Sequence, residues 1–104
     1  MPAWLTTVTT RLHLDRATKA ALDRLVIAAA RDLASLRVCC NVVNPGPVDT
    51  GWMNAALRRN LLAASPLDRL GQPGDTAALS SFLCSKDGGW INGQLLHSDG
   101  GLHV

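Results

Sequence analysis

The sequence predicts an α/β fold in which two parallel strands are connected through helices. Apolar residues recur at helical spacing over residues 15–36, the β-branched run RVCCNVV fills residues 37–43, and a second apolar run occupies residues 94–98. Two apolar strands joined through helical segments are expected to pair in parallel, with a right-handed crossover. The predicted order is helix, strand, short helix, helix, strand.

The first helix is predicted over residues 15–36 because its apolar residues are spaced three, four and seven positions apart. These residues are Leu22, Leu25, Val26, Ala29, Leu33 and Leu36. Alanines and an isoleucine between them widen the apolar stripe, which indicates two neighbouring elements rather than one. The strand that follows, residues 37–43, is continuously apolar, a pattern typical of a parallel strand buried on both faces.

The second half of the chain contains two further helices and a strand. A short amphipathic helix is marked by Met53, Ala56, Leu57 and Leu61. A helix is predicted over residues 73–84, because Pro73 suits its first position and Asp75 suits the positive end of its dipole. The last strand is expected at residues 94–98, before a Gly-Gly turn.

The composition excludes several classes of protein. The chain has 104 residues, 47% hydrophobic and 17% charged, with a net charge of +2, which fits one small soluble domain or part of one. The weak, scattered charge argues against a nucleic-acid partner, and no apolar run reaches the roughly 20 residues of a membrane span. The three cysteines lack metal-ligand spacing, and we expect them to be reduced and buried in a cytoplasmic protein.

The stretch NVVNPGPVDTG, residues 41–51, ends the first strand on a rigid corner that is poor in side chains. One interpretation is a plain connection from strand to helix, built from ordinary turn residues. The other is that Pro45 and Gly46 present backbone without bulk, so that a flat ligand can approach closely. The corner alone leaves both interpretations open.

Four motifs in a fixed order add a family resemblance. They are a helix carrying Lys19, a strand ending NPGPVDT, an RLGQP turn and a terminal GQLLHSDGG. Together they resemble the C-terminal part of a short-chain dehydrogenase/reductase, over about residues 17–101. The resemblance implies the C-terminal portion of a Rossmann-like, doubly wound parallel sheet, and covers roughly the last two-fifths of a usual member.

The resemblance also implies a cofactor site for NAD or NADP. Pro45 and Gly46 would lie under the nicotinamide ring, the backbone of Val48 would bind its carboxamide, and the Thr50 hydroxyl would lie nearby. Lys19 would be the catalytic lysine that binds the nicotinamide ribose. The implied partners are a small carbonyl or alcohol substrate and further copies of the chain, with no nucleic acid and no membrane.

The chain departs from the family pattern at the catalytic tyrosine, whose position, four residues before Lys19, is occupied by Asp15. An aspartate has a reference pKa of about 3.9, so keeping it protonated at pH 7 would cost about 4 kcal/mol. We therefore expect Asp15 to be the N-cap of the first helix. The family's Gly-rich pyrophosphate turn is absent as well.

Residues 1–14 do not resemble the family, and we expect residues 1–104 to form a single partial Rossmann-like domain whose family-like region is 15–104. The departures favour a truncated or frame-shifted reading of a longer gene. In the remaining segments, Met53, Leu57 and Leu61 either form a lid over a substrate or pack inward. Arg58 and Arg59 form a solvated face or contact an anionic substrate.

The histidines, His13, His97 and His103, show no spacing that suggests a metal site, so no metal is expected. Three functions remain open. The first is a family-level NAD(P)-dependent oxidoreductase whose isolated chain is inactive. The second is a non-catalytic half-domain that acts through oligomerisation, and the third is an unrelated acquired activity such as hydrolysis.

Overall fold

A computed structural model describes the backbone of residues 3–104 and the side chains from His13 onward. The elements in chain order are the α-helix α1 (Ala3–Asp32), the 3-10 helix η1 (Ala34–Leu36), the strand β1 (Val42–Asn44), the α-helices α2 (Ala55–Ala64) and α3 (Pro73–Leu83), the 3-10 helix η2 (Lys86–Gly88) and the strand β2 (Leu95–His97). The predicted order of helices and strands is confirmed.

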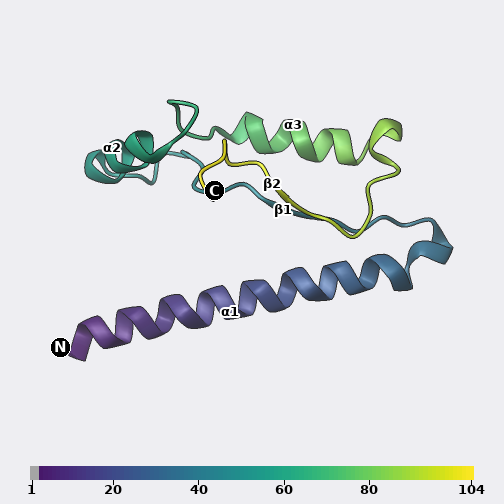
Figure 1. Cartoon of the computed structure of the whole chain (residues 1–104), viewed down its shortest axis with the longest axis horizontal. Coiled ribbons are helices and arrows are strands. Elements are labelled where there is room, and N and C mark those ends of the chain that lie inside the picture. The colour runs from purple at the N-terminus through teal and green to yellow at the C-terminus, as the bar shows by residue number, and fades with distance from the viewer. Residues whose placement is uncertain (1–2) are drawn as a thin grey trace.

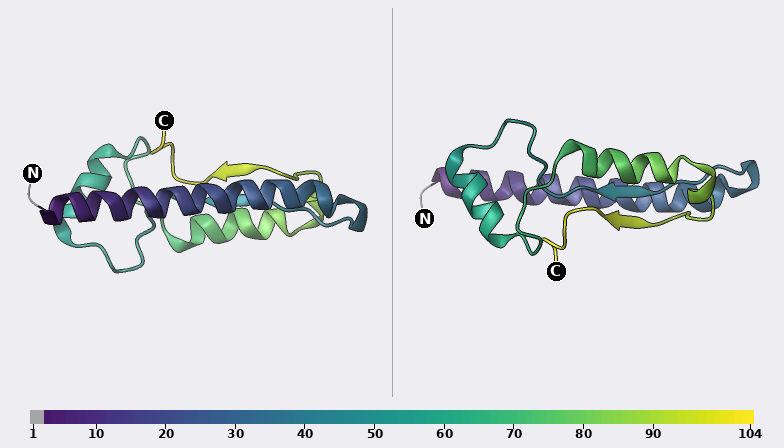
Figure 2. Two further views of the ribbon diagram at one scale, coloured as in Figure 1. Left: turned by 90° about the horizontal axis from the view of Figure 1, so that it is seen from below. Right: turned by 90° about the horizontal axis from the view of Figure 1, so that it is seen from above.

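The two strands pair in parallel, as predicted, in the register Val42 with Leu95, Val43 with Leu96 and Asn44 with His97. Figure 1 shows three layers, with α1 on one side of the strand pair and α3 on the other. Figure 2 shows that α1 runs along the strand pair when it is viewed from below and from above. The mixed α/β class and the crossover through helices are therefore both confirmed.

The first helix begins well before the predicted start, so the N-cap assignment of Asp15 is wrong. Asp15 lies inside α1, where its carbonyl accepts a hydrogen bond from the Thr18 hydroxyl at 2.9 Å. Its carboxylate pairs with Lys19 one turn later, at 3.6 Å. An aspartate followed by a cation at i+4 is also stable inside a helix. The sequence around Asp15 is therefore compatible with both a helix start and a helix interior.

The strands are shorter than predicted, and the first does not begin at residue 37. Arg37 has a φ of 59°, the left-handed conformation, which a strand residue does not adopt. Between Arg37 and β1, the Cys40 carbonyl accepts the Gly93 N–H at 2.8 Å. Side-chain amides add further contacts: the Cys40 N–H donates to Asn92 Oδ1 at 2.9 Å, and Asn41 Nδ2 donates to the Ile91 carbonyl at 2.9 Å.

The expected burial of the strand and of the cysteines is wrong for this chain. Among the described side chains, only Ala30 and Met53 are buried apolar residues, at 3% and 6% exposure. Cys39 and Cys84 are exposed and Cys40 is half-buried. Two three-residue strands offer too small a surface to cover both faces of a parallel pair, so sequence patterns typical of buried elements remain open to solvent.

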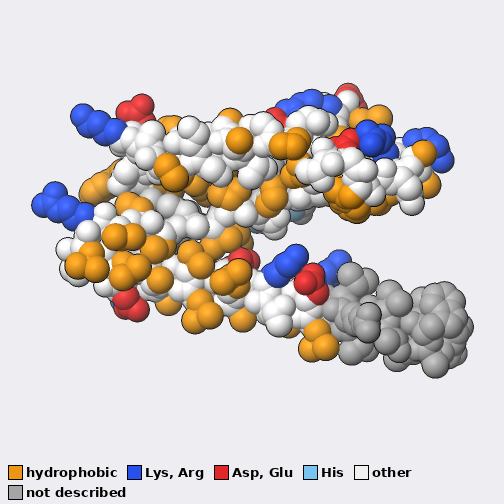
Figure 3. Space-filling model, turned by 180° about the vertical axis from the view of Figure 1, so that it is seen from behind, with side chains coloured by type: hydrophobic (Ala, Val, Ile, Leu, Met, Phe, Trp, Pro, Cys, Tyr) orange, Lys and Arg blue, Asp and Glu red, His pale blue; other side chains and the backbone are white. Residues whose placement is uncertain are grey.

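Because the small sheet cannot cover the helices, large apolar side chains remain exposed. They include Leu22, Leu25, Leu36, Val38, Phe82 and Trp90. Figure 3 shows hydrophobic side chains spread over the visible face of both helical layers. Within the described part of the chain, none of the helices combines the length and hydropathy needed to cross a membrane.

The start of α3 is stabilised by local polar contacts, as Pro73 and Asp75 predict. Asp75 accepts the Gln72 backbone N–H at 2.8 Å in a capping box, and Arg69 binds its two carboxylate oxygens at 2.7 and 2.8 Å. The Arg69 side chain and the Gln72 N–H hold the pKa of Asp75 well below its usual range. The ion pair also raises the pKa of Arg69.

Gly88, at the end of η2, provides a first test of the fold. A Cβ at this position would lie 2.7 Å from Leu83 Cα and would overlap the Phe82 carbonyl oxygen, both of which are backbone atoms. We expect Gly88→Ala to lower the free energy of unfolding by roughly 1–3 kcal/mol, because the end of α3 would have to shift. Urea unfolding followed by circular dichroism measures this change.

Gly74→Ala is the matched control, because a Cβ there meets nothing within 4 Å and the residue lies in the first turn of α3. Alanine favours the helix over glycine by up to about 1 kcal/mol, so this variant should be unchanged or more stable. Equal losses in both variants would contradict the packing described for η2.

The Asp75 carboxylate provides a pH-dependent test. Its pKa is lowered in the folded chain, so its contribution to stability is present above the ordinary aspartate range and is lost as the pH falls through that range toward the folded pKa. Asp75→Asn should therefore lower the urea midpoint at pH 7, and the difference from the wild type should begin to narrow below about pH 4 and continue to narrow as the pH falls further. Asp87→Asn, at an exposed carboxylate in η2, is the control, and a gap that stays the same size between about pH 5 and about pH 2 would contradict the assignment.

Candidate functional site

The corner after β1 has the geometry of a tight turn backed by the chain itself. The Gly46 N–H donates to Asn44 Oδ1 at 3.0 Å, and Gly46 has a φ of +61°. A Cβ on Gly46 would lie 2.8 Å from Cβ of Asp99, in the turn after β2. Glycine is thus required here by the left-handed backbone and by the close approach of Asp99, as the turn interpretation expects.

The segment after the corner is fixed to two neighbouring loops. Val48 forms a parallel bridge with Gly71, and its carbonyl accepts the indole N–H of Trp52 at 2.8 Å. Among the described residues, the Val48 N–H donates to no partner, and Thr50 is exposed. Within the described part of the chain, the Val48 N–H and the Thr50 hydroxyl at this corner therefore have no hydrogen-bond partner.

Arg58 stabilises the same segment from α2. Its guanidinium pairs with Asp49 at 2.5 Å, and the Asp49 side chain is 10% exposed. Asp49 also accepts the Gly51 N–H at 3.2 Å. Arg58 therefore has a partner within the chain, which explains it without an anionic substrate, whereas its neighbour Arg59 is exposed.

The three residues considered for a substrate lid differ in burial. Met53 is 6% exposed and packs inward. Leu57 and Leu61 are half-buried, and Leu61 lines a small cavity with Pro45 and Pro47. Leu61 on α2 therefore faces the Pro-Gly corner across this cavity.

Lys19 lies on an open part of α1. Its side chain is 73% exposed, and Asp15, its ion-pair partner, is 59% exposed. Among the described residues, no hydrogen bond or ion pair joins Lys19 to the Pro45–Thr50 segment. The ammonium group is solvated and paired with a carboxylate that screens it only weakly.

A second polar cluster, at the end of β2, was not predicted. Gly100 and Gly101 have φ values of 66° and 84°, and the turn they form brings His103 back onto His97. The two imidazole rings stack with centroids 3.8 Å apart and planes 13° apart. The only signal in the sequence is the Gly-Gly pair between the histidines, because their separation along the chain matches no regular helix or strand period.

Asp99 lies at the centre of this cluster and is 6% exposed. Partial burial disfavours its charged form, but hydrogen bonds from the Gly101 N–H and the His103 ring outweigh that effect, so the pKa of Asp99 lies below its usual value. Asp99 thus contacts His103 through its carboxylate and faces Gly46 through its Cβ.

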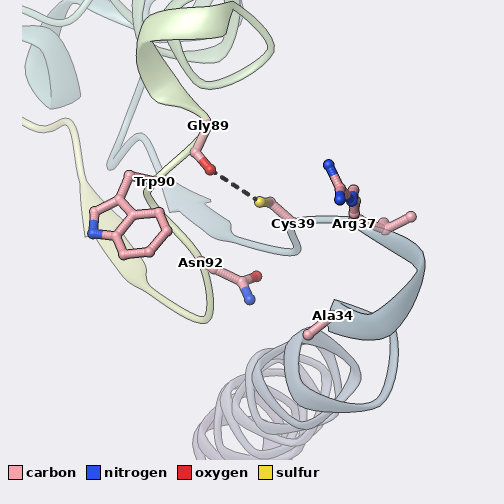
Figure 4. A pocket seen from close by; sticks show the side chains of 7 residues that line it. Ala34, Arg37, Cys39, Gly89, Trp90 and Asn92 are labelled. Atoms are coloured by element: carbon pink, nitrogen blue, oxygen red, sulfur yellow. Dashed lines mark hydrogen bonds between the residues drawn. The ribbon is translucent and has the colours of Figure 1, made fainter.

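A pocket larger than the cavity at the Pro-Gly corner lies at the opposite end of the strand pair. It has a volume of about 560 Å³ and is lined by Ala34, Arg37, Val38, Cys39, Gly89, Trp90 and Asn92. Figure 4 shows its lining, with the Cys39 thiol 3.6 Å from the Gly89 carbonyl. These residues precede β1 and β2, whereas open parallel sheets bind ligands beyond the carboxyl ends of their strands. The Pro-Gly corner is therefore the better candidate site, despite its smaller cavities.

Comparisons with known proteins identify the family. The family model described as enoyl-(acyl carrier protein) reductase matches residues 6–103, which extends the similarity into the segment that looked atypical. The oxidoreductase YjdA of Bacillus subtilis is 41% identical over 86 residues, which cover 83% of this chain and 34% of that protein. The 3-oxoacyl-[acyl-carrier-protein] reductase MabA of Mycobacterium bovis is 35% identical, over 83% of this chain and 36% of its own length.

Solved structures indicate the same family. A short-chain dehydrogenase from Bacillus anthracis superposes with a TM-score of 0.76 at 31% identity, covering 85% of this chain and 36% of that one. The angucycline C-6 ketoreductase LanV, solved with bound NADP, superposes with a TM-score of 0.77 at 30% identity, over 83% and 35% of the two chains. The chain spans about a third of the length of the curated relatives that it matches. It belongs to the short-chain dehydrogenase/reductase family and corresponds to the C-terminal part of such a protein.

Proposed function

We propose that this chain is the nicotinamide-side portion of an NAD(P)-dependent oxidoreductase acting on a small carbonyl or alcohol. The observation that supports the proposal most directly is the Pro-Gly corner at the carboxyl end of β1, in a chain whose family is shown by residues 6–103. Ligands of open α/β sheets bind at this end of the strands.

The groups left free at the corner suit the nicotinamide end of the cofactor. The Val48 N–H can donate to a carboxamide oxygen, and the exposed Thr50 hydroxyl can donate or accept beside it. Pro45 and Gly46 add no bulky polar side chain to the surface that a flat ring would cover. NAD(P), when bound, supplies or takes up the hydride.

Lys19 would act through its ammonium group, by donating to ribose hydroxyls and by lowering the pKa of a nearby tyrosine. That role requires Lys19 to leave Asp15. Because both side chains are more than half exposed, little free energy opposes the exchange. The substrate would lie against α2, with Leu57 and Leu61 as the apolar wall and Met53 as its buried support.

The chain lacks two parts that this chemistry needs. It contains no tyrosine and no Gly-rich turn for a pyrophosphate. General acid–base catalysis typically contributes 10²–10⁴-fold, and the positioning of reactants contributes independently. The two losses multiply, so the chain by itself is inactive.

A second candidate function is association without catalysis, because the exposed apolar surface of α1 and α3 is large for a chain of this size. Contiguous apolar patches on soluble chains mark interaction sites. The three free thiols are consistent with a cytoplasmic location, where cysteines stay reduced.

The catalytic proposal predicts that the purified chain gives no NAD(P)H oxidation above background with a panel of ketones, and that Asp15→Tyr does not change this. A chimera should be active if the N-terminal part of Bacillus subtilis YjdA replaces residues 1–14, a tyrosine stands in place of Asp15, and this chain continues from Arg16. Loss of nicotinamide absorbance at 340 nm follows the reaction.

Lys19→Ala in the chimera should lower kcat/KM by about 10²-fold or more, because the tyrosine would lose its cationic neighbour. Lys86→Ala, at the chain's other lysine, is the matched control and should leave activity unchanged. Robust Lys19-dependent turnover by the chain alone would contradict the proposal that the chain lacks groups needed for catalysis. A folded but inactive chimera would contradict it as well.

The association proposal predicts a homo-oligomer at tens of micromolar, formed through the apolar surface that includes Leu25, which is 68% exposed. Leu25→Glu should shift sedimentation toward monomer, because a carboxylate would be buried between copies. Val104→Glu, at the 94% exposed last residue, should not. A wild-type chain that sediments only as a monomer would rule this interface out.

A further inference from the structure

The cluster of His97, Asp99 and His103 has no role in the proposed function, and it gathers three metal-ligating side chains at one place. One ligand atom from each residue can be chosen so that all three lie within 4.8 Å of one another. Tetrahedral bonds of about 2.0–2.2 Å place two donors of one zinc ion about 3.3–3.6 Å apart. Donors near the 4.8 Å limit would therefore have to approach each other by roughly 1 Å to coordinate the same ion.

The position of each donor follows from the fold. His97 is the last residue of β2, fixed by its pairing with Asn44. Asp99 is fixed against Gly46 and accepts the Gly101 N–H at 3.0 Å. His103 is exposed and follows the Gly100–Gly101 turn, and its Nδ1 lies 2.9 Å from Asp99 Oδ2.

The carboxylate has room for a cation while it holds the turn. An ionised carboxylate offers about four acceptor positions. The Gly101 N–H and the His103 ring use two of them. A cation can replace the proton between His103 Nδ1 and the Asp99 carboxylate, because a deprotonated imidazole nitrogen and a carboxylate oxygen are both metal ligands.

Both imidazoles can adjust, because both histidines are exposed and His103 is 44% accessible in its side chain. The stacked rings, 3.8 Å apart, need only rotate about their side-chain bonds to direct a nitrogen each toward a shared point. Imidazole and carboxylate donors suit Zn²⁺ and neighbouring divalent transition metals better than Mg²⁺ or Ca²⁺.

We propose that His97, Asp99 and His103 form a binding site for a divalent transition-metal cation of the zinc type. Two imidazole nitrogens and one carboxylate oxygen supply the protein ligands, and water completes the coordination. The site is built on the same turn that supports Gly46, so a bound cation would fix the end of β2 against the Pro-Gly corner.

Isothermal titration of the untagged chain with ZnCl₂ tests the site, after the three thiols have been blocked with iodoacetamide so that they cannot bind zinc. One Zn²⁺ per chain is expected. His97→Ala and His103→Ala should each weaken binding by about tenfold or more, as the loss of a ligand or its support does. His13→Ala is the matched control, because His13 lies on α1, outside the cluster, and it should bind as the wild type does.

A measurement on the unsubstituted chain keeps the test decisive if a histidine variant fails to fold. Zinc should shift the ring-nitrogen NMR signals of His97 and His103 and leave those of His13 unchanged. Equal zinc affinity in all three alanine variants would overturn the proposal, and so would equal shifts at all three histidines or no binding at 100 µM zinc.

Discussion

The arrangement of this chain depends on one side-chain amide, that of Asn92. Its oxygen accepts the Cys40 N–H at 2.9 Å, and its nitrogen donates to the Ala30 carbonyl at 3.2 Å. Asn92, which lies shortly before β2, thereby binds both the segment that leads into β1 and the last turn of α1. Beside it, Ala30 is the most buried apolar residue described, and a Cβ on Gly93 would lie 3.5 Å from it. Small side chains let α1 approach the sheet, and the amide satisfies the backbone groups that the approach would otherwise leave without partners.

Because this contact is polar and involves only one side chain, it joins α1 to the segments before β1 and β2 without supplying a large core. Parallel strands are normally covered on both faces by packed helices. Here the helices lie on both faces, yet Leu22, Leu25 and Phe82 stay more than 40% exposed. A sheet of two strands is too narrow for two helical layers, so the apolar stripe on α1 is wider than the surface it meets. The excess apolar surface is what makes a partner, whether another copy or a longer sheet, physically favourable.

Asp99 connects the two polar regions at the carboxyl ends of the strands. Its Cβ lies against Gly46, so it sets the shape of the Pro-Gly corner from behind. Its carboxylate holds the Gly101 N–H and the His103 ring. Asp99 therefore contacts both the histidine cluster and the backbone that is proposed to face the nicotinamide ring. The corner and the cluster are far apart in the sequence, and Asp99 brings them into contact in the structure.

The sequence by itself determined the order of the elements, the parallel pairing and the start of α3, because periodicity, Pro73 and Asp75 act within a few residues of the positions they specify. It also placed the Pro-Gly corner and, through its motifs, the family. The tertiary structure alone decided where α1 begins, since Asp15 suits a helix interior paired with Lys19 as well as an N-cap. It alone shortened β1, because the left-handed backbone of Arg37 is not encoded in the apolar pattern. Burial and the histidine cluster were likewise decided there, because exposure depends on how much sheet is present to be covered, and the contact of His97 with His103 depends on the positive φ angles of Gly100 and Gly101.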